Sequence, residues 1–465
     1  MGKTSILKNA VEREATFKPA NLHEQIIYSR AMEAVNWGMP LVNYELMYQA
    51  FLKLGGNFNQ VALWPGLPDW RNQTLTPNPD VIYLMPFFNT KEVGPVVLEI
   101  PPADDGLING SVMDCWQNAI EDVGPAGVDK GKGGKYLILP PGYKERVSNN
   151  YIEMQSDTFQ GYALLRSVLK STSDEDIKTA IRYAKRIKVY PLSQANNPPQ
   201  TVFHDVRGRM FDSTIPYDLR FFQSLDRMIQ SEVWLTRDKV MIDFLKTIGI
   251  EKGKTFHPDL ATEEILNDAA RDAHLWIDSR YDGVFSPAYF DKTHWALPAT
   301  KEVVDGMPTF FGNPDSYPID GRGVTYSMAF FSAKHLGEGQ FYLMAIKDKN
   351  GEPFRGDSTY RLRVPANAPV KQYWSATAYD RETHAFIRDM DTSGRSSQSE
   401  GIERNPDGSV DVYFGPQAPP GKEHNWVPTN SKRGFEVLFR FYGPEKTLFD
   451  KSWRMGDVEK VDDRK

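Results

Sequence analysis

The sequence predicts a mainly β protein with helical insertions, an α+β fold. Short β-rich runs separated by turn residues fill residues 61–204 and again residues 301–465. Residues 205–300 instead carry apolar residues at helical spacing. Aromatic residues make up 12% of the 465-residue chain, and its 35 glycines and 32 prolines are typical of short strands joined by turns. This length predicts two to three domains.

Composition and charge exclude several classes of protein. The net charge of -6 leaves no basic footprint for nucleic acid. No run reaches the roughly 18 to 20 apolar residues that a membrane span requires, so we expect a soluble protein. The single cysteine, Cys115, cannot form an intrachain disulfide. The start of the chain lacks the apolar core of a signal peptide, which predicts a cytoplasmic protein if that start is native.

Residues 1–60 are expected to form N-terminal helices. Asn21, followed three residues later by Glu24, matches a helix-capping arrangement. Apolar residues then recur at helical spacing over 26–54, where Gly38 and Pro40 interrupt the pattern. This predicts two helices or one kinked helix.

Residues 61–204 are predicted to form an N-terminal β domain. Strand-like runs cover 93–100, 107–118, 136–139 and 189–192. Ser173 opens one helix between them. The following region, residues 205–300, is predicted to be a helical connector between two β units, because three apolar stripes recur there at helical spacing.

Residues 301–465 are predicted to form a C-terminal antiparallel sandwich or jelly roll. The strand-like runs follow one another without helices between them, which favours antiparallel pairing. They cover 339–346, 359–364, 371–380, 410–414 and 435–442. Alternation along 373–380 places Tyr373 and Tyr379 on one face and Trp374 and Asp380 on the other.

The stretch Thr76–Tyr83 is where we first expect chemistry. Two prolines flank Asn78 and fix a turn, after which Asp80 and Tyr83 open an extended run. If 108–118 is one strand, Asp114 and Trp116 share a face with Asn118.

Asp80 and Asp114 are therefore candidates for a catalytic acid/base pair, with Asn78, Tyr83 and Trp116 as substrate-binding residues. The structural alternative is that Asp80 caps the turn and Asp114 accepts hydrogen bonds from buried backbone amides.

A divalent metal is a further hypothesis. His294, His384 and His424 lie in or just before the C-terminal β region, and strands of a jelly roll could bring them together with Asp380. The alternative is that they are isolated histidines, because no metal-binding spacing is present. A serine hydrolase of the usual kind is excluded, because the chain has no Gly-x-Ser-x-Gly motif.

Aromatic residues favour a binding function without turnover. Trp374 and the loop-like pair Asn425 and Trp426 offer flat apolar faces with polar groups beside them, which suits a sugar or another small ligand. Most tryptophans are expected in the core.

Several motifs resemble a bacterial family in which domain of unknown function 1254 precedes domain of unknown function 1214. The first domain's motifs are Thr76–Asp80 with Tyr83, 94–98, Asp114 with Trp116, and 139–143. The second domain's motifs are 373–375, 405–409, 425–426 and 449–453. The resemblance implies a β domain, a helical middle and a jelly-roll-like domain, and a periplasmic or secreted location. It implies no activity.

Three hypotheses follow. The first is a hydrolase-like enzyme that uses Asp80 and Asp114 in a cleft between the β domains. The second is a binding or assembly module for a small molecule, glycan or partner. The third is a metal-dependent enzyme that uses the C-terminal histidines. By analogy with jelly-roll coats, the protein is expected to form a homo-oligomer.

Overall fold

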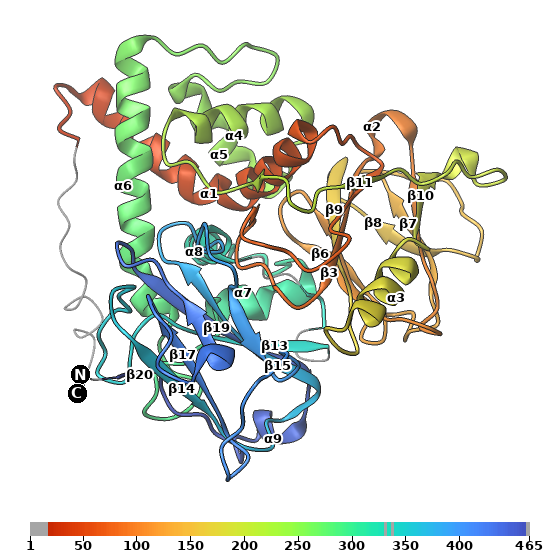
Figure 1. Ribbon diagram of the computed structural model, residues 1–465. Coiled ribbons are helices and arrows are strands. Elements are labelled where there is room, and N and C mark those ends of the chain that lie inside the picture. Colours follow the sequence, from red (N-terminus) through yellow and green to blue (C-terminus); the bar gives the residue numbers. More distant parts are fainter. Residues whose placement is uncertain (1–16, 330–332, 336–338, 462–465) are drawn as a thin grey trace.

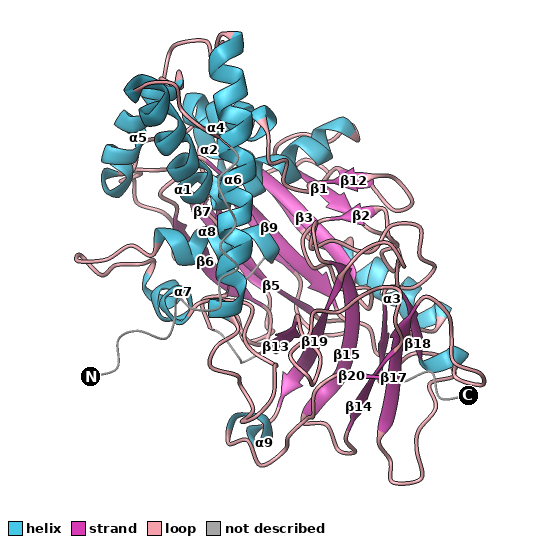
Figure 2. Ribbon diagram, turned by 90° about the vertical axis from the view of Figure 1, so that its left-hand side faces the viewer, coloured by secondary structure: helices cyan, strands magenta, loops and turns pink. Residues whose placement is uncertain are grey.

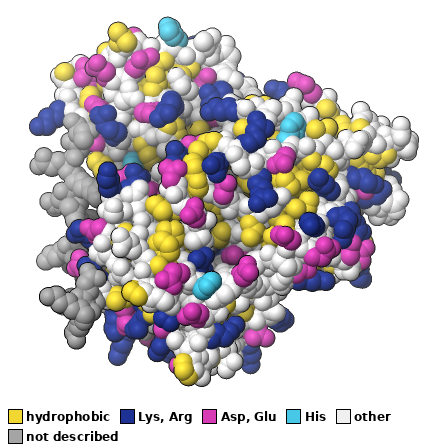
Figure 3. All heavy atoms as spheres, in the orientation of Figure 1, with side chains coloured by type: hydrophobic (Ala, Val, Ile, Leu, Met, Phe, Trp, Pro, Cys, Tyr) yellow, Lys and Arg dark blue, Asp and Glu magenta, His cyan; other side chains and the backbone are white. Residues whose placement is uncertain are grey.

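The computed structural model describes residues 17–329, 333–335 and 339–461, and it has the predicted α+β fold. A β domain from the first half of the chain, a layer of helices and a C-terminal β sandwich pack against one another (Figure 1). In the same orientation, basic and acidic side chains are interspersed over the visible face (Figure 3). No helix in the described ranges is both long enough and apolar enough to cross a membrane.

The N-terminal β domain is built from a larger sheet with strand order β11-β1-β3-β9-β5-β6, packed on a second sheet with order β10-β4-β7-β8. Side chains such as Leu84, Val112 and Leu165 fill the core between the sheets together with Leu98 and Ile138. In chain order, the elements of this domain are β1 Gln60–Leu63, β2 Asn72–Gln73, β3 Ile82–Asn89, α2 Thr90–Val93, β4 Val96–Ile100, β5 Ile108–Asp114, β6 Ala119–Val123, β7 Gly134–Leu139, β8 Ile152–Gln155, β9 Gln160–Ser167, α3 Asp174–Ala184, β10 Lys188–Pro191, β11 Phe203–Asp205 and β12 Phe211–Asp212.

The opposite face of the larger sheet is covered partly by helices. Helix α1 (Leu22–Lys53) begins at Asn21, whose side chain accepts a hydrogen bond from the Glu24 amide, as the capping pattern predicts. It is a single helix that contains Pro40. The other helices are α4 Leu219–Ser231, α5 Lys239–Leu245, α6 Leu260–Val284, α7 Lys301–Gly306 and α8 Ile319–Met328.

The predicted boundary at residue 300 does not separate helices from strands. Helices α7 and α8 follow it, and α8 packs against α1 and α6. The strands of the sandwich begin only at β13. Helix α8 is buried along most of its length, so it is part of the helical layer. That layer therefore extends to Met328.

The C-terminal domain is a sandwich with strand orders β13-β19-β15-β16 and β18-β17-β14-β20, antiparallel except for the pair β17–β18 (Figure 2). Its core includes Leu343, Trp374, Val412 and Phe439. In chain order, its elements are β13 Gln340–Ala345, β14 Tyr360–Val364, β15 Val370–Asp380, β16 Gly394–Ser396, β17 Val410–Gly415, β18 Trp426–Pro428, β19 Phe435–Pro444, α9 Lys446–Phe449 and β20 Glu459–Lys460.

The two β domains meet face to face. Because side chains alternate along a strand, Trp374 points into the sandwich core while Tyr373 and Tyr379 join the cluster shared with the helices and the N-terminal sheet. Leu164, on β9, belongs to the same cluster as Tyr373 and Tyr379. This confirms the predicted alternation and places polar side chains of β15 and β19 against the N-terminal domain.

Candidate functional site

A buried polar cluster, which we call the junction cluster, joins the two β domains. Its centre is Asn78, in the turn that the two prolines fix. The Asn78 amide nitrogen donates to the Tyr83 hydroxyl at 2.8 Å, and its side-chain Nδ2 donates to the hydroxyls of Tyr373 at 3.0 Å and Tyr442 at 2.8 Å. The rings of Tyr373 and Tyr442 are stacked, with centroids 4.5 Å apart. The predicted binding residues Asn78 and Tyr83 therefore lie together at the domain junction.

Arg440, on β19, ties this turn to the sandwich. Its side chain is 1% exposed, and Nη2 donates to the backbone oxygens of Thr76 at 2.7 Å and Pro77 at 3.3 Å. The same guanidinium donates to Thr377 Oγ1 at 3.0 Å and to the Tyr379 hydroxyl at 2.5 Å. Arg440 thus has neutral acceptors around it, and it holds the turn in place.

Arg166, on β9, is the second guanidinium of the junction cluster. It is 7% exposed, and its Nε has no hydrogen-bond partner. The guanidinium carbon lies 5.5 Å from the centroid of the Tyr83 ring. Within the described ranges, no carboxylate forms an ion pair with Arg166. Phenols surround the guanidinium: Tyr83, which is hydrogen-bonded to it, Tyr342 and Tyr442.

A cavity, which we call the junction cavity, lies beside Arg166. It has a volume of about 60 Å³, and strands of both β domains line it. Its walls combine apolar side chains, such as Leu164 and Phe341, with a few polar ones. The buried Gln340 Oε1, like Arg166 Nε, has no partner. A smaller cavity of about 20 Å³ shares Leu164, Arg166 and Tyr342 with it and reaches Arg440.

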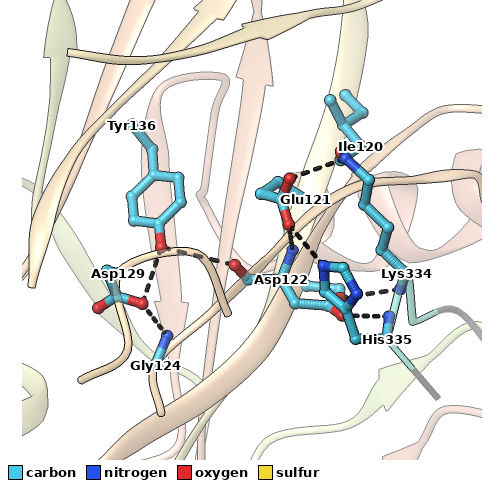
Figure 4. A network of polar contacts seen from close by, with 9 residues as sticks. Ile120, Glu121, Asp122, Gly124, Asp129, Tyr136, Lys334 and His335 are labelled. Atoms are coloured by element: carbon cyan, nitrogen blue, oxygen red, sulfur yellow. Dashed lines mark hydrogen bonds and ion pairs between the residues drawn. The ribbon is translucent and has the colours of Figure 1, made fainter. Parts of the chain in front are cut away.

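A network of polar contacts includes two residues of the junction-cavity wall, Asp122 and His335 (Figure 4). Asp122 accepts hydrogen bonds from the Ser111 hydroxyl at 2.6 Å and from the backbone amides of Lys334 and His335. Glu121 pairs with Lys334 Nζ at 2.7 Å. Because the side chain of His335 is 40% exposed, the part of the cavity wall that His335 forms lies at the molecular surface.

Asp80 lies next to the junction cluster but does not line the cavity. Its backbone amide donates to Asn78 Oδ1, and its own Oδ2 is buried without a partner. Burial raises the pKa of Asp80 to about 6, although Arg440, Ser396 and Arg395 favour the ionised form.

The raised pKa of Asp80 predicts a pH-dependent stability. The folded protein holds this proton more tightly than the unfolded chain, so the contribution is complete below about pH 4 and is lost as the pH rises through about 6. We expect Asp80→Asn to remove this loss, which is about 2 kcal/mol between pH 4 and pH 7. Urea unfolding of both proteins at several pH values measures it. Equal pH profiles would contradict the prediction.

Asp114 lies elsewhere and does not pair with Asp80. Asp114 is opposite Gly161 on β9, whereas Ile82, two residues after Asp80, is opposite Ser167 on the same strand. Six residues of strand separate these levels by about 20 Å, far beyond the reach of a carboxylate pair. The expected acid/base pair is therefore not formed.

The strand predicted over 107–118 ends at Asp114, and this explains the position of that carboxylate. Asp114 Oδ1 accepts from the amides of Trp116 and Asn118, both at 2.9 Å, and Oδ2 accepts from Asn118 Nδ2 at 2.8 Å. Gln117 has a left-handed backbone with φ 65°. Asp114 thus organises a tight turn into β6, which is the structural alternative that the sequence left open.

The predicted aromatic binding residues do not meet at the cavity. Trp116 packs on Trp37 against helix α1, with ring centroids 5.0 Å apart. Trp374 is stacked on Phe439 in the sandwich core. Asn425 immediately precedes β18, and Trp426 is the first residue of that strand. There the Asn425 side chain donates to the backbone oxygens of residues 403 and 411, and the Trp426 ring donates to that of residue 415. These contacts support the sandwich.

The histidines proposed as metal ligands are also separate. His294 pairs with Asp457 at 3.0 Å, and His384 lies between Glu436 and Tyr281. His424 is exposed in the loop before β18. Among the residues that the structure describes, no group of three or more His, Cys, Asp or Glu side chains could hold a metal ion. The predicted cluster of His294, His384 and His424 with Asp380 is therefore not formed.

The residues that sequence reasoning missed are Arg166, Gln340, Tyr342 and Arg440. A signal for two of them was present. Arg166 follows Tyr162 and Leu164 on one face of an otherwise apolar strand, and Arg440 interrupts the apolar run of β19 in the same way. An arginine in the centre of a buried strand is uncommon unless it has a partner or a ligand.

Two segments of the chain, one from each β domain, match family models. Residues 58–191 match the family described as protein of unknown function (DUF1254), and residues 339–446 match protein of unknown function (DUF1214). A search of curated proteins found no match.

A solved structure shows a similar fold. The crystal structure of the VPA0106 protein from Vibrio parahaemolyticus has a TM-score of 0.58 at 18% identity, over 94% of this chain and 100% of that one. An uncharacterised protein from Burkholderia cenocepacia has a TM-score of 0.41 at 11% identity, over 94% of each chain. With both family matches in the expected order, the chain belongs to the family that joins DUF1254 to DUF1214.

Proposed function

We propose that the protein binds a small organic molecule in the junction cavity. Ligand sites are concave and mostly apolar, with a few convergent polar groups, and they often lie between domains. The junction cavity has these properties. The observation that carries the proposal is that Arg166 Nε and Gln340 Oε1 are buried beside this cavity and have no hydrogen-bond partner among the described residues. Buried polar groups normally have a partner, which a ligand would supply here.

This proposal follows the binding hypothesis rather than the hydrolase hypothesis. The hydrolase hypothesis requires a carboxylate pair, and the strand register keeps Asp80 and Asp114 apart. A cavity of about 60 Å³ suits a small molecule better than a glycan chain. Formation of a homo-oligomer and a periplasmic or secreted location stay predictions of the sequence.

Filling the cavity should prevent binding. Ala126 lines the cavity and is partly exposed, so Ala126→Trp can place an indole ring in the space without disturbing the core. We would screen neutral and charged compounds of about ten non-hydrogen atoms, and we expect some of them to bind the unmodified protein. The affinity of these binders should fall at least tenfold in Ala126→Trp. Ligand-observed NMR, which detects millimolar binding, measures the affinities.

Ala103→Trp is the matched control, because Ala103 is an exposed alanine of the same domain that does not line the cavity. It should bind like the unmodified protein. A panel without binders, or binders that both tryptophan variants retain equally, would refute the proposal.

A further inference from the structure

We infer that the ligand of the junction cavity carries a carboxylate that pairs with Arg166. This inference rests on the proposed function and names the class of ligand. It follows from a charge imbalance at the domain junction rather than from the shape of the cavity.

Among the residues that the structure describes, the buried guanidinium of Arg166 has no countercharge. Arg166 is 7% exposed, and within the described ranges no carboxylate pairs with it. A buried charge is costly unless it is paired and hydrogen-bonded. The phenols around it, Tyr83, Tyr342 and Tyr442, offer only neutral oxygens. An anion in the adjoining cavity would supply the missing charge.

The other charges nearby do not fulfil this role. Arg440 is the second buried guanidinium of the cluster, and its N–H groups already donate to backbone, threonine and tyrosine oxygens. Asp80 is the carboxyl beside Arg440 and Arg395. Asp122 also lines the cavity, and its carboxylate accepts hydrogen bonds from Ser111 and from two backbone amides. Arg166 thus remains the cation of the cavity wall that has no anionic partner among the described residues.

The surroundings of Arg166 favour a carboxylate over other anions. A planar guanidinium matches the two oxygens of a carboxylate, and the apolar side chains of Leu164 and Phe341 would contact an organic body. A phosphate, with up to two charges, would need further cationic donors at this wall. His335 also lines the cavity, but its ring already faces the carboxylate of Glu121. We therefore assign a small organic monocarboxylate as the ligand class.

Matched acids and amides test this assignment. Benzoate, phenylacetate and hexanoate would each be compared with the corresponding amide, which has the same shape and no charge, and phenyl phosphate would be included. Ligand-observed NMR would measure their affinities for the full chain. We expect at least one carboxylate to bind tenfold or more tightly than its amide and than phenyl phosphate.

Two variants locate the charge that is responsible. Arg166→Gln should remove the preference for the acid, and Arg166→Lys should retain part of it. Gln340→Glu, which lines the same cavity, places a carboxylate near the guanidinium and should remove the preference while the amide still binds. Arg395→Gln is the control, because Arg395 also has a buried Nε without a partner but does not line the cavity. Thermal unfolding would confirm that each variant is folded.

The outcomes separate the inference from the proposed function. If binders displaced by Ala126→Trp include amides that bind as tightly as their acids, or if the preference persists in both Arg166→Gln and Gln340→Glu, the carboxylate assignment is wrong and the cavity remains a binding site. Tighter binding of phenyl phosphate would also overturn it. If no compound binds, both the inference and the proposed function are refuted.

Discussion

Arg440→Leu is expected to lower the free energy of unfolding by about 3 to 5 kcal/mol. Arg440 is buried, and one guanidinium satisfies the backbone oxygens of Thr76 and Pro77 together with Thr377 Oγ1. Leucine would leave these buried acceptors without donors. It would also leave Asp80 without its main favourable electrostatic partner.

Urea unfolding measures this effect. Arg361→Leu is the matched control, because Arg361 lies on β14 with its side chain 38% exposed and paired with Glu459. The control should change stability by about 0.5 kcal/mol or less. A similar loss of stability in both variants would contradict the conclusion that Arg440 holds the turn between the two domains.

His384→Asn is expected to destabilise the protein by about 3 kcal/mol. The imidazole is 2% exposed and bridges Glu436 Oε1 at Nδ1 and the Tyr281 hydroxyl at Nε2, both at 2.9 Å. Tyr281 in turn contacts Ser327 Oγ at 2.9 Å. The chain thus connects the sandwich to helices α6 and α8. Removing the imidazole takes away the hydrogen bond to Glu436 Oε1 and leaves the buried carboxylate with the longer ion pair to Arg381, at 3.8 Å.

Asparagine is the appropriate replacement, because His384 has a left-handed backbone with φ 54° and asparagine tolerates that conformation. Chemical denaturation gives the loss, and His424→Asn, at an exposed histidine, should leave stability nearly unchanged. A stable His384→Asn variant would contradict a structural role for this bridge.

The sequence predicted the elements of the fold well where one periodicity dominated. Alternation along β15 correctly separated Tyr373 and Tyr379 from Trp374, because one face of that strand meets the sandwich core and the other meets the N-terminal domain. The capping pair Asn21 and Glu24 likewise marked the start of α1.

The strand predicted over 107–118 was wrong at its end, for a local reason. The Asp114 carboxylate accepts the amides of Trp116 and Asn118, and this competes with a continued strand. Alternation alone cannot detect such a turn. The expected pairing of Asp114 with Asp80 was wrong for a separate reason, because the register on β9 places the two carboxylates at levels about 20 Å apart.

The candidate site was predicted only in part. Asn78 and Tyr83 are close in sequence, and the proline-fixed turn brings them together. Arg166 and Gln340, by contrast, belong to different domains, and only the packing of β9 against β13 places them on one cavity. The lack of a partner for each becomes visible only when the surrounding atoms are known. Local pattern cannot supply that information.

The most direct test is a crystal structure of the protein with 4-bromobenzoate, in which anomalous scattering locates the bromine. We predict one bromine peak inside the junction cavity, near Leu164 and Phe341, with the carboxylate within hydrogen-bonding distance of Arg166. A peak elsewhere on the protein, or an empty cavity at saturating concentration, would contradict the proposal that the two β domains enclose a binding site for a small acid.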